Sequence, residues 1–155
     1  MANHHGDFIW YELLTSDQTA AEHFYANLLG WRMSGDPSYR HIEASEGQVG
    51  GMLSLTAEMT AGGARPAWMG YILVDDVDKM IASIEQGGGK TLWPARDMGN
   101  VGRIAMVADP QGAPFYLIKP QPPEDRPDEE SHAFSYDRPR HGHCAWNELS
   151  TTDPE

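Results

Sequence analysis

The sequence predicts an α+β fold in which one βαβββ unit occurs twice. Two observations support this prediction. A strand that leads through an Asp into a helix occurs twice, and three short extended stretches follow each helix. The two strand–helix segments superpose without gaps at an offset of 59 residues (76 minus 17), so that Asp17 falls on Asp76 and Gly30 on Gly89. Repetition of element order, caps and stops together indicates an internal duplication.

The first unit is expected over about 6–58. Its strand covers 8–14 and leads into Thr15-Ser16-Asp17, residue types that favour a helix N-cap, and Gly30 ends the helix. The helix carries apolar residues on one face: Ala20 or Ala21, Phe24 and Leu28. The extended stretches that follow are expected at 31–33, 39–44 and 49–55.

The second unit is expected over about 66–120. Its strand covers 68–74, Asp75-Asp76 provides the cap, and Gly87-Gly88-Gly89 ends the helix. The apolar residues at helical spacing are Val77, Met80, Ile81 and Ile84. Extended stretches are expected at 91–93, 102–108 and 113–118.

Charge and composition exclude several classes of partner. The net charge of −12 argues against nucleic acid, because phosphate binding needs clustered positive charge. Polar residues or glycine interrupt every apolar stretch, so no membrane span is expected, and the N-terminus has no secretion-signal pattern. The single Cys144 excludes an intramolecular disulfide. A cytoplasmic protein is expected.

A third, partial copy of the strand follows the two units. Residues 142–153 align with 6–17 at an offset of 136 (142 minus 6), which pairs Trp10 with Trp146 and Glu12 with Glu148. The organisation expected is a domain over 1–122, a linker rich in Pro and acidic residues over 123–140, and the first strand of an incomplete further copy over 141–155. The chain would then be a piece of a longer protein with a second domain of the same type; the alternative is a coincidental short match.

Two motifs carry a resemblance to a known family. Residues 108–116, Ala-Asp-Pro-Gln-Gly-Ala-Pro-Phe-Tyr, are similar to the D-P-x-G-N-x-hydrophobic-E ending on the last strand of the vicinal-oxygen-chelate superfamily, which includes glyoxalase I, bleomycin-resistance proteins and extradiol dioxygenases. Residues 74–78, Val-Asp-Asp-Val-Asp, resemble the start of the family's second helix. The resemblance covers 6 to about 120 and is closest to two-domain glyoxalase-like proteins of unassigned activity.

The resemblance implies a curled mixed sheet with an open cleft and with helices on the outer face. It also implies a metal site whose His, Gln or Glu ligands come from the first and last strand of each unit. In this sequence those positions hold Trp10, Met69 and Tyr116, with the fourth near Gly51 if Gly47 matches Gly112. None of these side chains is a competent ligand for a divalent cation, so no cofactor is expected.

Strand alternation places Glu12 on the cleft face, two residues from the ligand position. A carboxylate facing an aromatic cleft could act as a general base or accept a hydrogen bond from a ligand. The alternative is a structural carboxylate paired with an Arg or Tyr. The cleft residues expected to bind a flat or apolar small molecule, or else to fill the cleft, are Trp10, Met69, Tyr71, Trp93 and Tyr116. Arg103 is expected to meet an anionic ligand or to pair with Glu12.

The leading hypothesis is a glyoxalase-like protein that binds a small molecule without the family metal. One alternative is a metal-dependent lyase or dioxygenase with unusual ligands, for which His41 and Glu43 are the candidates because they share a strand face. A second is a drug-sequestering protein of the bleomycin-resistance type, acidic and acting as a homodimer. A third is a filled sheet that serves only the missing second domain.

Overall fold

The computed structural model describes residues 3–127 and 129–153, so residues 1–2, 128 and 154–155 of the predicted domain, linker and further copy lie outside the described residues. The chain forms two compact units. The first unit comprises Ile9–Gly70 and Ser131–Trp146. The second comprises Tyr71–Glu130 together with both ends of the chain, up to Phe8 and from Asn147. Each unit contains a mixed sheet with a helix of ten or twelve residues, and the first unit contains a second, short helix in addition.

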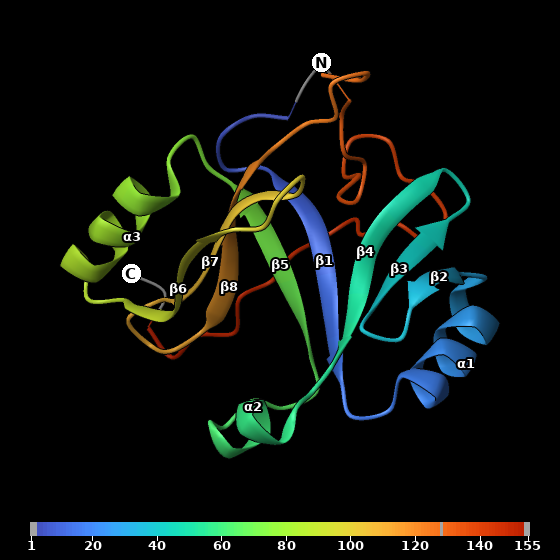
Figure 1. The fold of residues 1–155 in the computed structure, drawn as a ribbon, viewed down its shortest axis with the longest axis horizontal. Coiled ribbons are helices and arrows are strands. Elements are labelled where there is room, and N and C mark those ends of the chain that lie inside the picture. Colours follow the sequence, from blue (N-terminus) through green and yellow to red (C-terminus); the bar gives the residue numbers. More distant parts are fainter. Residues whose placement is uncertain (1–2, 128, 154–155) are drawn as a thin grey trace. The chain divides into compact units, whose positions relative to one another are not determined.

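The first unit follows the predicted βαβββ order. Its elements are β1 (Phe8–Thr15), α1 (Gln18–Leu29), β2 (Arg32–Asp36), β3 (Tyr39–Ala44), β4 (Gly47–Ser54) and the short helix α2 (Ala57–Ala61). The strands lie in the order β2-β3-β4-β1, with β1 parallel to β4 and the other neighbours antiparallel. In Figure 1, α1 lies beside this sheet. The βαβββ prediction is confirmed for this unit.

The predicted caps bound α1, although the predicted apolar face is not the buried one. The Asp17 side chain accepts a hydrogen bond from the Ala20 amide at 2.9 Å, and Gly30 ends the helix in the left-handed conformation at φ 69°. Phe24 and Leu28 are 60% and 63% exposed, whereas Ala21 and Tyr25 pack against the core. That core contains Leu13, Ile42, Ala44, Val49 and Met52.

The second unit repeats the order with β5 (Ala67–Leu73), α3 (Val77–Gln86), β6 (Lys90–Asp97), β7 (Gly102–Ala108) and β8 (Pro114–Pro120), although the first residues of β5 belong to the first unit. Its strand order is β5-β8-β7-β6, with β5 parallel to β8. Asp76 caps α3 by accepting from the Lys79 amide at 3.1 Å. The predicted helix face is confirmed here, because Val77, Met80, Ile81 and Ile84 pack against Val74, Ala105, Val107 and Leu117. The predicted α+β fold of two βαβββ units is therefore correct.

Several strands run longer than predicted. The largest extensions at the C-terminal ends are those of β2 to Asp36, β6 to Asp97 and β8 to Pro120. Pro94 is accommodated in β6 because that strand lies at an edge of the sheet and its register with β7 shifts on both sides of Trp93. None of the helices in the described residues is long and apolar enough to cross a membrane.

Part of the predicted linker is packed against the first unit. Ala133 is fully buried, the Ser131 hydroxyl donates to the Ile9 carbonyl, and Arg140 pairs with Glu46 at 3.3 Å. The Trp31 indole nitrogen donates to the Gly142 carbonyl at 2.8 Å. These contacts explain why residues 131–146 belong to this unit although their Pro-rich, polar composition is typical of a linker.

The C-terminal segment reproduces the turn chemistry of its proposed counterpart. The Thr15 hydroxyl accepts from the Asp17 amide at 3.1 Å and donates to the Asp17 carbonyl at 3.2 Å. The Thr151 hydroxyl likewise accepts from the Asp153 amide at 3.1 Å, and its oxygen lies 3.0 Å from the Asp153 carbonyl. Residues 142–153 form no strand, and within them only Cys144 takes part in an isolated bridge. That this segment begins a further copy stays a prediction.

Candidate functional site

A row of four cross-strand neighbours on the first unit's sheet contains the predicted Glu12. Glu12 on β1 pairs with Gly51 on β4, Gly51 pairs with His41 on β3, and His41 pairs with Ser34 on β2. Directly paired residues point to the same face of a sheet, so these four positions share one face. The β3–β4 register shifts at a bulge at Val49, and this shift determines the face of the sheet on which position 51 lies.

Glu12 lies at the centre of a buried hydrogen-bonded group. Its side chain is only 3% exposed, and the Tyr39 hydroxyl from β3 donates a hydrogen bond to it. The Trp10 indole nitrogen donates in turn to the Tyr39 hydroxyl at 3.0 Å. A buried carboxylate is tolerated only when it is hydrogen-bonded, and Tyr39 provides that partner. The sequence left two interpretations of Glu12: a functional carboxylate, or a structural carboxylate paired with an Arg or Tyr. The structure contains the pairing with a Tyr.

The environment keeps the Tyr39 phenol protonated. Burial, and then the negative charge of Glu12, raise the pKa of the Tyr39 hydroxyl well above its ordinary value of about 10, while the hydrogen bond from Trp10 lowers it and the one to Glu12 raises it. A phenol that stays neutral can donate to a carboxylate and accept from an indole at the same time. The order of donation is therefore Trp10 to Tyr39 to Glu12.

His41 borders this group on the side away from Glu12. Its ring centroid lies 5.4 Å from that of Tyr39 and 6.1 Å from that of Trp10, both in edge-on geometry. Its Nδ1 is buried and has no hydrogen-bond partner among the described residues. Such an atom can receive a polar group of a ligand, because an unpaired buried nitrogen costs free energy until it is satisfied.

Glu43, the proposed metal-binding companion of His41, is engaged elsewhere. Its carboxylate accepts from the Ser34 hydroxyl at 3.1 Å and pairs with Arg32 at 3.6 Å. Among the described residues, no group of three or more His, Cys, Asp or Glu side chains is arranged to hold a metal ion. The structure therefore supplies no third ligand for the pair that the sequence offered as an alternative.

The second unit carries a matching row of different chemistry. Trp93 on β6 pairs with Met106 on β7, Met106 with Tyr116 on β8, and Tyr116 with Tyr71 on β5. The Tyr71 and Tyr116 rings stack with centroids 4.3 Å apart and an angle of 15° between their planes. Tyr71 and Tyr116 are 7% and 8% exposed. The structure thus brings together three of the predicted aromatic residues.

The two rows agree with the offsets of the sequence repeat. Glu12 and Ser34 map onto Tyr71 and Trp93 at the offset of 59, and Gly51 and His41 map onto Tyr116 and Met106 at an offset of 65 (116 minus 51). The latter offset is the one obtained by matching Gly47 with Gly112. The position near Gly51 is thereby fixed as the counterpart of Tyr116.

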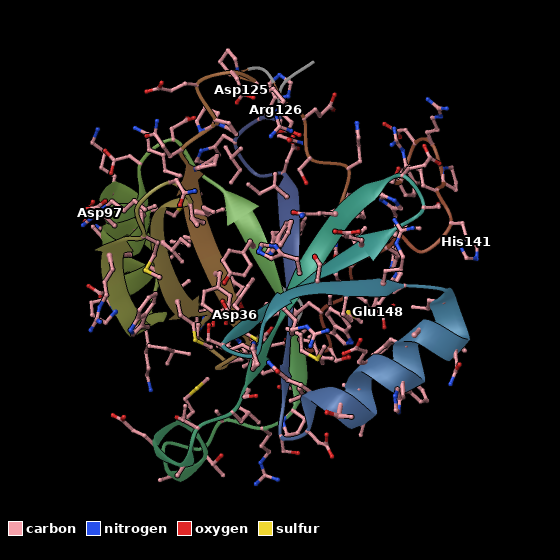
Figure 2. All side chains as sticks on the ribbon, turned by 45° about the vertical axis from the view of Figure 1, so that its right-hand side comes forward. Asp36, Asp97, Asp125, Arg126, His141 and Glu148 are labelled. Atoms are coloured by element: carbon pink, nitrogen blue, oxygen red, sulfur yellow. The ribbon has the colours of Figure 1, made fainter. Side chains whose placement is uncertain are left out.

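Two other predicted residues lie apart from these rows. Arg103 lies on the α3 side of the sheet, where its guanidinium makes two bonds to Asp78, at 2.8 and 2.9 Å, and one to Asp97 at 3.1 Å; Asp97 is labelled in Figure 2. Arg103 holds the pKa of the Asp78 carboxyl below its ordinary value. Met69 is buried in the first unit's part of β5, at 3% exposure. Their roles in ligand binding stay predictions.

The residues at the positions of the superfamily's metal ligands do not fit a divalent cation. The Trp10 indole donates its only hydrogen to Tyr39, Gly51 has no side chain, and the thioether of Met69 is too soft for the hard or borderline metals. The Tyr116 ring is stacked and would have to ionise.

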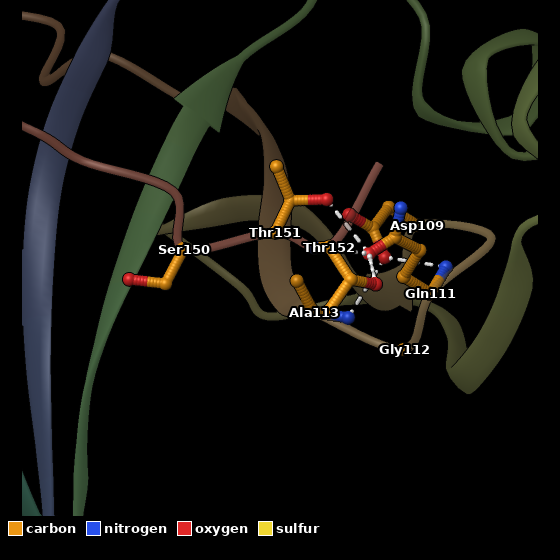
Figure 3. A pocket seen from close by; sticks show the side chains of 7 residues that line it. All are labelled: Asp109, Gln111, Gly112, Ala113, Ser150, Thr151 and Thr152. Carbon is orange, nitrogen blue, oxygen red and sulfur yellow. Dashed lines mark hydrogen bonds between the residues drawn. The ribbon is translucent and has the colours of Figure 1, made fainter. Parts of the chain in front are cut away.

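A shallow pocket lies at the turn between β7 and β8 in the second unit (Figure 3). The Gln111 side chain accepts from the Thr151 hydroxyl at 2.7 Å and from the Thr152 amide at 3.3 Å, and it donates to the Asp153 carbonyl at 3.0 Å. Its amide is therefore used to hold the C-terminal segment rather than to bind a ligand. The lining residues are Asp109, Gln111, Gly112, Ala113, Ser150, Thr151 and Thr152.

The sequence did not identify Tyr39 as a member of the Glu12 group, nor Ser34 and Met106 as members of the two rows. Tyr39 and His41 occupy alternate positions of one predicted strand, so strand alternation could have placed both on one face. Which face of which neighbouring strand they meet depends on the β3–β4 register, which is not a local property of the sequence.

Comparison with curated proteins finds relatives of similar sequence. The chain is 33% identical over 156 aligned positions to a Mycobacterium tuberculosis protein named "Putative glyoxylase CFP32", covering 94% of this chain and 54% of that protein. It is 27% identical to the Streptomyces peucetius "Anthracycline biosynthesis protein DnrV", covering 68% of this chain and 44% of that protein. The chain thus spans about half the length of these curated relatives.

Solved structures show the same fold. Methylmalonyl-CoA epimerase from Mycobacterium tuberculosis superposes with a TM-score of 0.52 at 19% identity, over 76% of this chain and 89% of that one. Residues 7–117 match the family described as the Glyoxalase/Bleomycin resistance protein/Dioxygenase superfamily, and these residues include both rows. The chain belongs to the glyoxalase/bleomycin resistance protein/dioxygenase superfamily.

Proposed function

We propose that this chain binds a small organic molecule at the Glu12 group, without the divalent metal that the superfamily often uses. One observation carries the proposal: Glu12, at 3% exposure, is held by the neutral hydroxyl of Tyr39 on the same sheet face as Trp10 and His41. A buried carboxylate attracts a cation or a hydrogen-bond donor, and the aromatic rings beside it suit a flat body.

The net charge of −12 favours a cationic ligand, because a negative surface raises the local concentration of cations. The similarity to a relative named as an anthracycline biosynthesis protein supports flat, polycyclic ligands. A non-enzymatic sequestering protein would need no more than this. An enzyme would in addition use Glu12 to take a proton from the bound molecule.

The test combines metal analysis with a thermal-shift screen of the untagged chain. The probes are an anthracycline and a bleomycin as cationic compounds, and the hemithioacetal of methylglyoxal and glutathione as an aldehyde–thiol adduct. A ligand at about 100 times its Kd is expected to raise Tm by roughly 5–10 °C. The shift should persist after chelation and be lost in Glu12→Gln.

The matched control is Glu58→Gln, which changes an exposed Glu at the start of α2 and should keep the full shift. Stoichiometric Zn, Ni, Mn or Fe, with binding abolished by its removal, would overturn the proposal. An equal shift in Glu12→Gln and Glu58→Gln would also overturn it. Turnover of the adduct by the chelated wild type, lost in Glu12→Gln, would support an enzymatic role over sequestration.

A further inference from the structure

Tyr39 connects the members of the Glu12 group, although it lies on neither of the strands that carry the superfamily's ligands. Its hydroxyl accepts from Trp10 and donates to Glu12, and its ring contacts the edge of His41. All of these partners belong to the first unit. Removing the Tyr39 hydroxyl would therefore change Trp10 and Glu12 together.

Gly51 provides the space in which this phenol lies. A Cβ at position 51 would overlap the hydroxyl oxygen and ring carbons of Tyr39. Gly51 is itself buried, and it separates Glu12 from His41 in the row of cross-strand pairs. The phenol fits over the sheet only because this position carries no side chain.

The corresponding position of the second unit is filled by its own side chain. Tyr116 is the counterpart of Gly51, and its ring stacks on Tyr71, the counterpart of Glu12. By the resemblance described above, the superfamily places a metal-binding side chain at this position of the last strand. In the first unit the space of that side chain is taken by a phenol from β3.

We propose that Tyr39 is the positioning residue of the Glu12 site and that Gly51 admits it in place of a metal-binding side chain. The phenol fixes the orientation of the Glu12 carboxylate through the hydrogen bond that it donates. This inference deepens the proposed function and rests on it. A Tyr at position 39 together with a Gly at position 51 then distinguishes this organic-ligand site from a metal site.

The experiment is a ¹⁵N–¹H spectrum of the indole N–H groups of the full chain, with Trp10 assigned from the Trp10→Phe spectrum. In Tyr39→Phe the Trp10 resonance should shift, because its acceptor is gone. In Gly51→Ala it should shift as well, because the new Cβ displaces the phenol. Gly62→Ala, where a Cβ meets no atom closer than 3.4 Å, is the matched control and should leave it unchanged.

Ligand binding provides the second readout. For any probe found in the screen above, Tyr39→Phe should bind roughly tenfold more weakly, as expected for a misplaced hydrogen-bonding group. If Gly51→Ala does not fold, the pair Tyr39→Ala and Tyr39→Ala/Gly51→Ala replaces it: with the ring removed, adding the methyl group at position 51 should cost little thermal stability.

Two results would overturn this inference. One is an unmoved Trp10 resonance in Tyr39→Phe, and the other is a Gly51→Ala chain with the spectrum and stability of Gly62→Ala. Either would leave the proposed function intact, since Glu12 could still bind the ligand. Conversely, a required stoichiometric metal would overturn the proposed function whatever the indole spectra show.

Discussion

The two βαβββ units share a backbone plan and differ in what they place at equivalent positions. The first unit's row contains Ser34, His41, Gly51 and Glu12, and the second unit's row contains Trp93, Met106, Tyr116 and Tyr71. The first row is polar and depends on a phenol contributed by Tyr39. The second is apolar, and its Tyr71 and Tyr116 rings stack on each other. Equivalent positions of the two units thus hold a hydrogen-bonded carboxylate in one and a stacked pair of rings in the other.

The largest loss of stability is expected when the carboxylate of the first unit's row is introduced at the equivalent position of the second unit. Tyr71→Glu would place a carboxylate beside the Tyr116 ring, where Ile104 occupies the position corresponding to Tyr39 (offset 65, 104 minus 39). A buried charge without a designed partner costs about 3–5 kcal/mol of the free energy of unfolding. Urea denaturation measures this loss, which should shrink at acidic pH as the carboxylate protonates. Tyr71→Phe keeps the ring and serves as the control; equal losses in both variants would contradict the comparison.

A smaller loss of stability is expected when the Glu12 side chain of the first unit is removed. Glu12→Ala leaves the buried Tyr39 hydroxyl without its acceptor and should lower the free energy of unfolding by about 1–3 kcal/mol. Glu12→Gln keeps an acceptor oxygen and should lose less. Denaturant titrations of both variants beside Glu58→Gln measure the difference. If Glu12→Gln were as costly as Glu12→Ala, the negative charge rather than hydrogen bonding would hold the centre together.

The raised pKa of Tyr39 predicts an alkaline stability change that belongs to the first unit. Above the unfolded pKa of about 10 the unfolded chain loses this proton while the folded chain keeps it, so the free energy of unfolding falls by up to about 1.4 kcal/mol per pH unit. The stabilisation is fully present below pH 10 and is lost as pH rises towards the folded pKa. Tyr39→Phe should remove this contribution, whereas Tyr136→Phe, an exposed control, should not. Identical alkaline slopes in wild type and Tyr39→Phe would contradict it.

The smallest effect is expected at the exposed ion pairs of the second unit. Arg103→Gln removes the contacts to Asp78 and Asp97 that connect β7 with α3 and β6. Because these pairs are solvent-exposed, the loss of thermal stability should be slight and should disappear in high salt. Melting curves at low and high ionic strength test this. A large, salt-independent loss would mean that this unit also depends on a polar centre.

The sequence predicted the elements better than it predicted the faces. The Asp caps, the glycine stops and the apolar positions of α3 follow local rules, and they are confirmed. The predicted apolar face of α1 is not the buried one, because Phe24 and Leu28 point to solvent while Tyr25 packs with Trp31 and Trp68. Packing against this aromatic group outweighs the simple apolar spacing.

The candidate site was predicted in part. Glu12 was identified by strand alternation and by its recurrence as Glu148, yet the two residues differ: Glu12 is buried, whereas Glu148, labelled in Figure 2, is exposed. The recurrence covers the residue type and not its environment: Glu12 lies on β1, paired with β4, whereas Glu148 lies in no strand. Arg103 was expected to meet an anionic ligand or to pair with Glu12. In the structure it contacts Asp78 on α3 and Asp97 on β6, and a role in ligand binding stays a prediction.

The sequence by itself determined the strand–helix order and the caps, because each depends on residues close together in the chain. It also determined the duplication, because the two copies align with each other without knowledge of the structure. Only the tertiary structure decided that Tyr39 reaches Glu12. That contact needs β3, β4 and β1 side by side, a bulge at Val49 and a glycine at position 51. Cross-strand register is set by long-range pairing, and a shift of one residue would have turned the phenol to the opposite face.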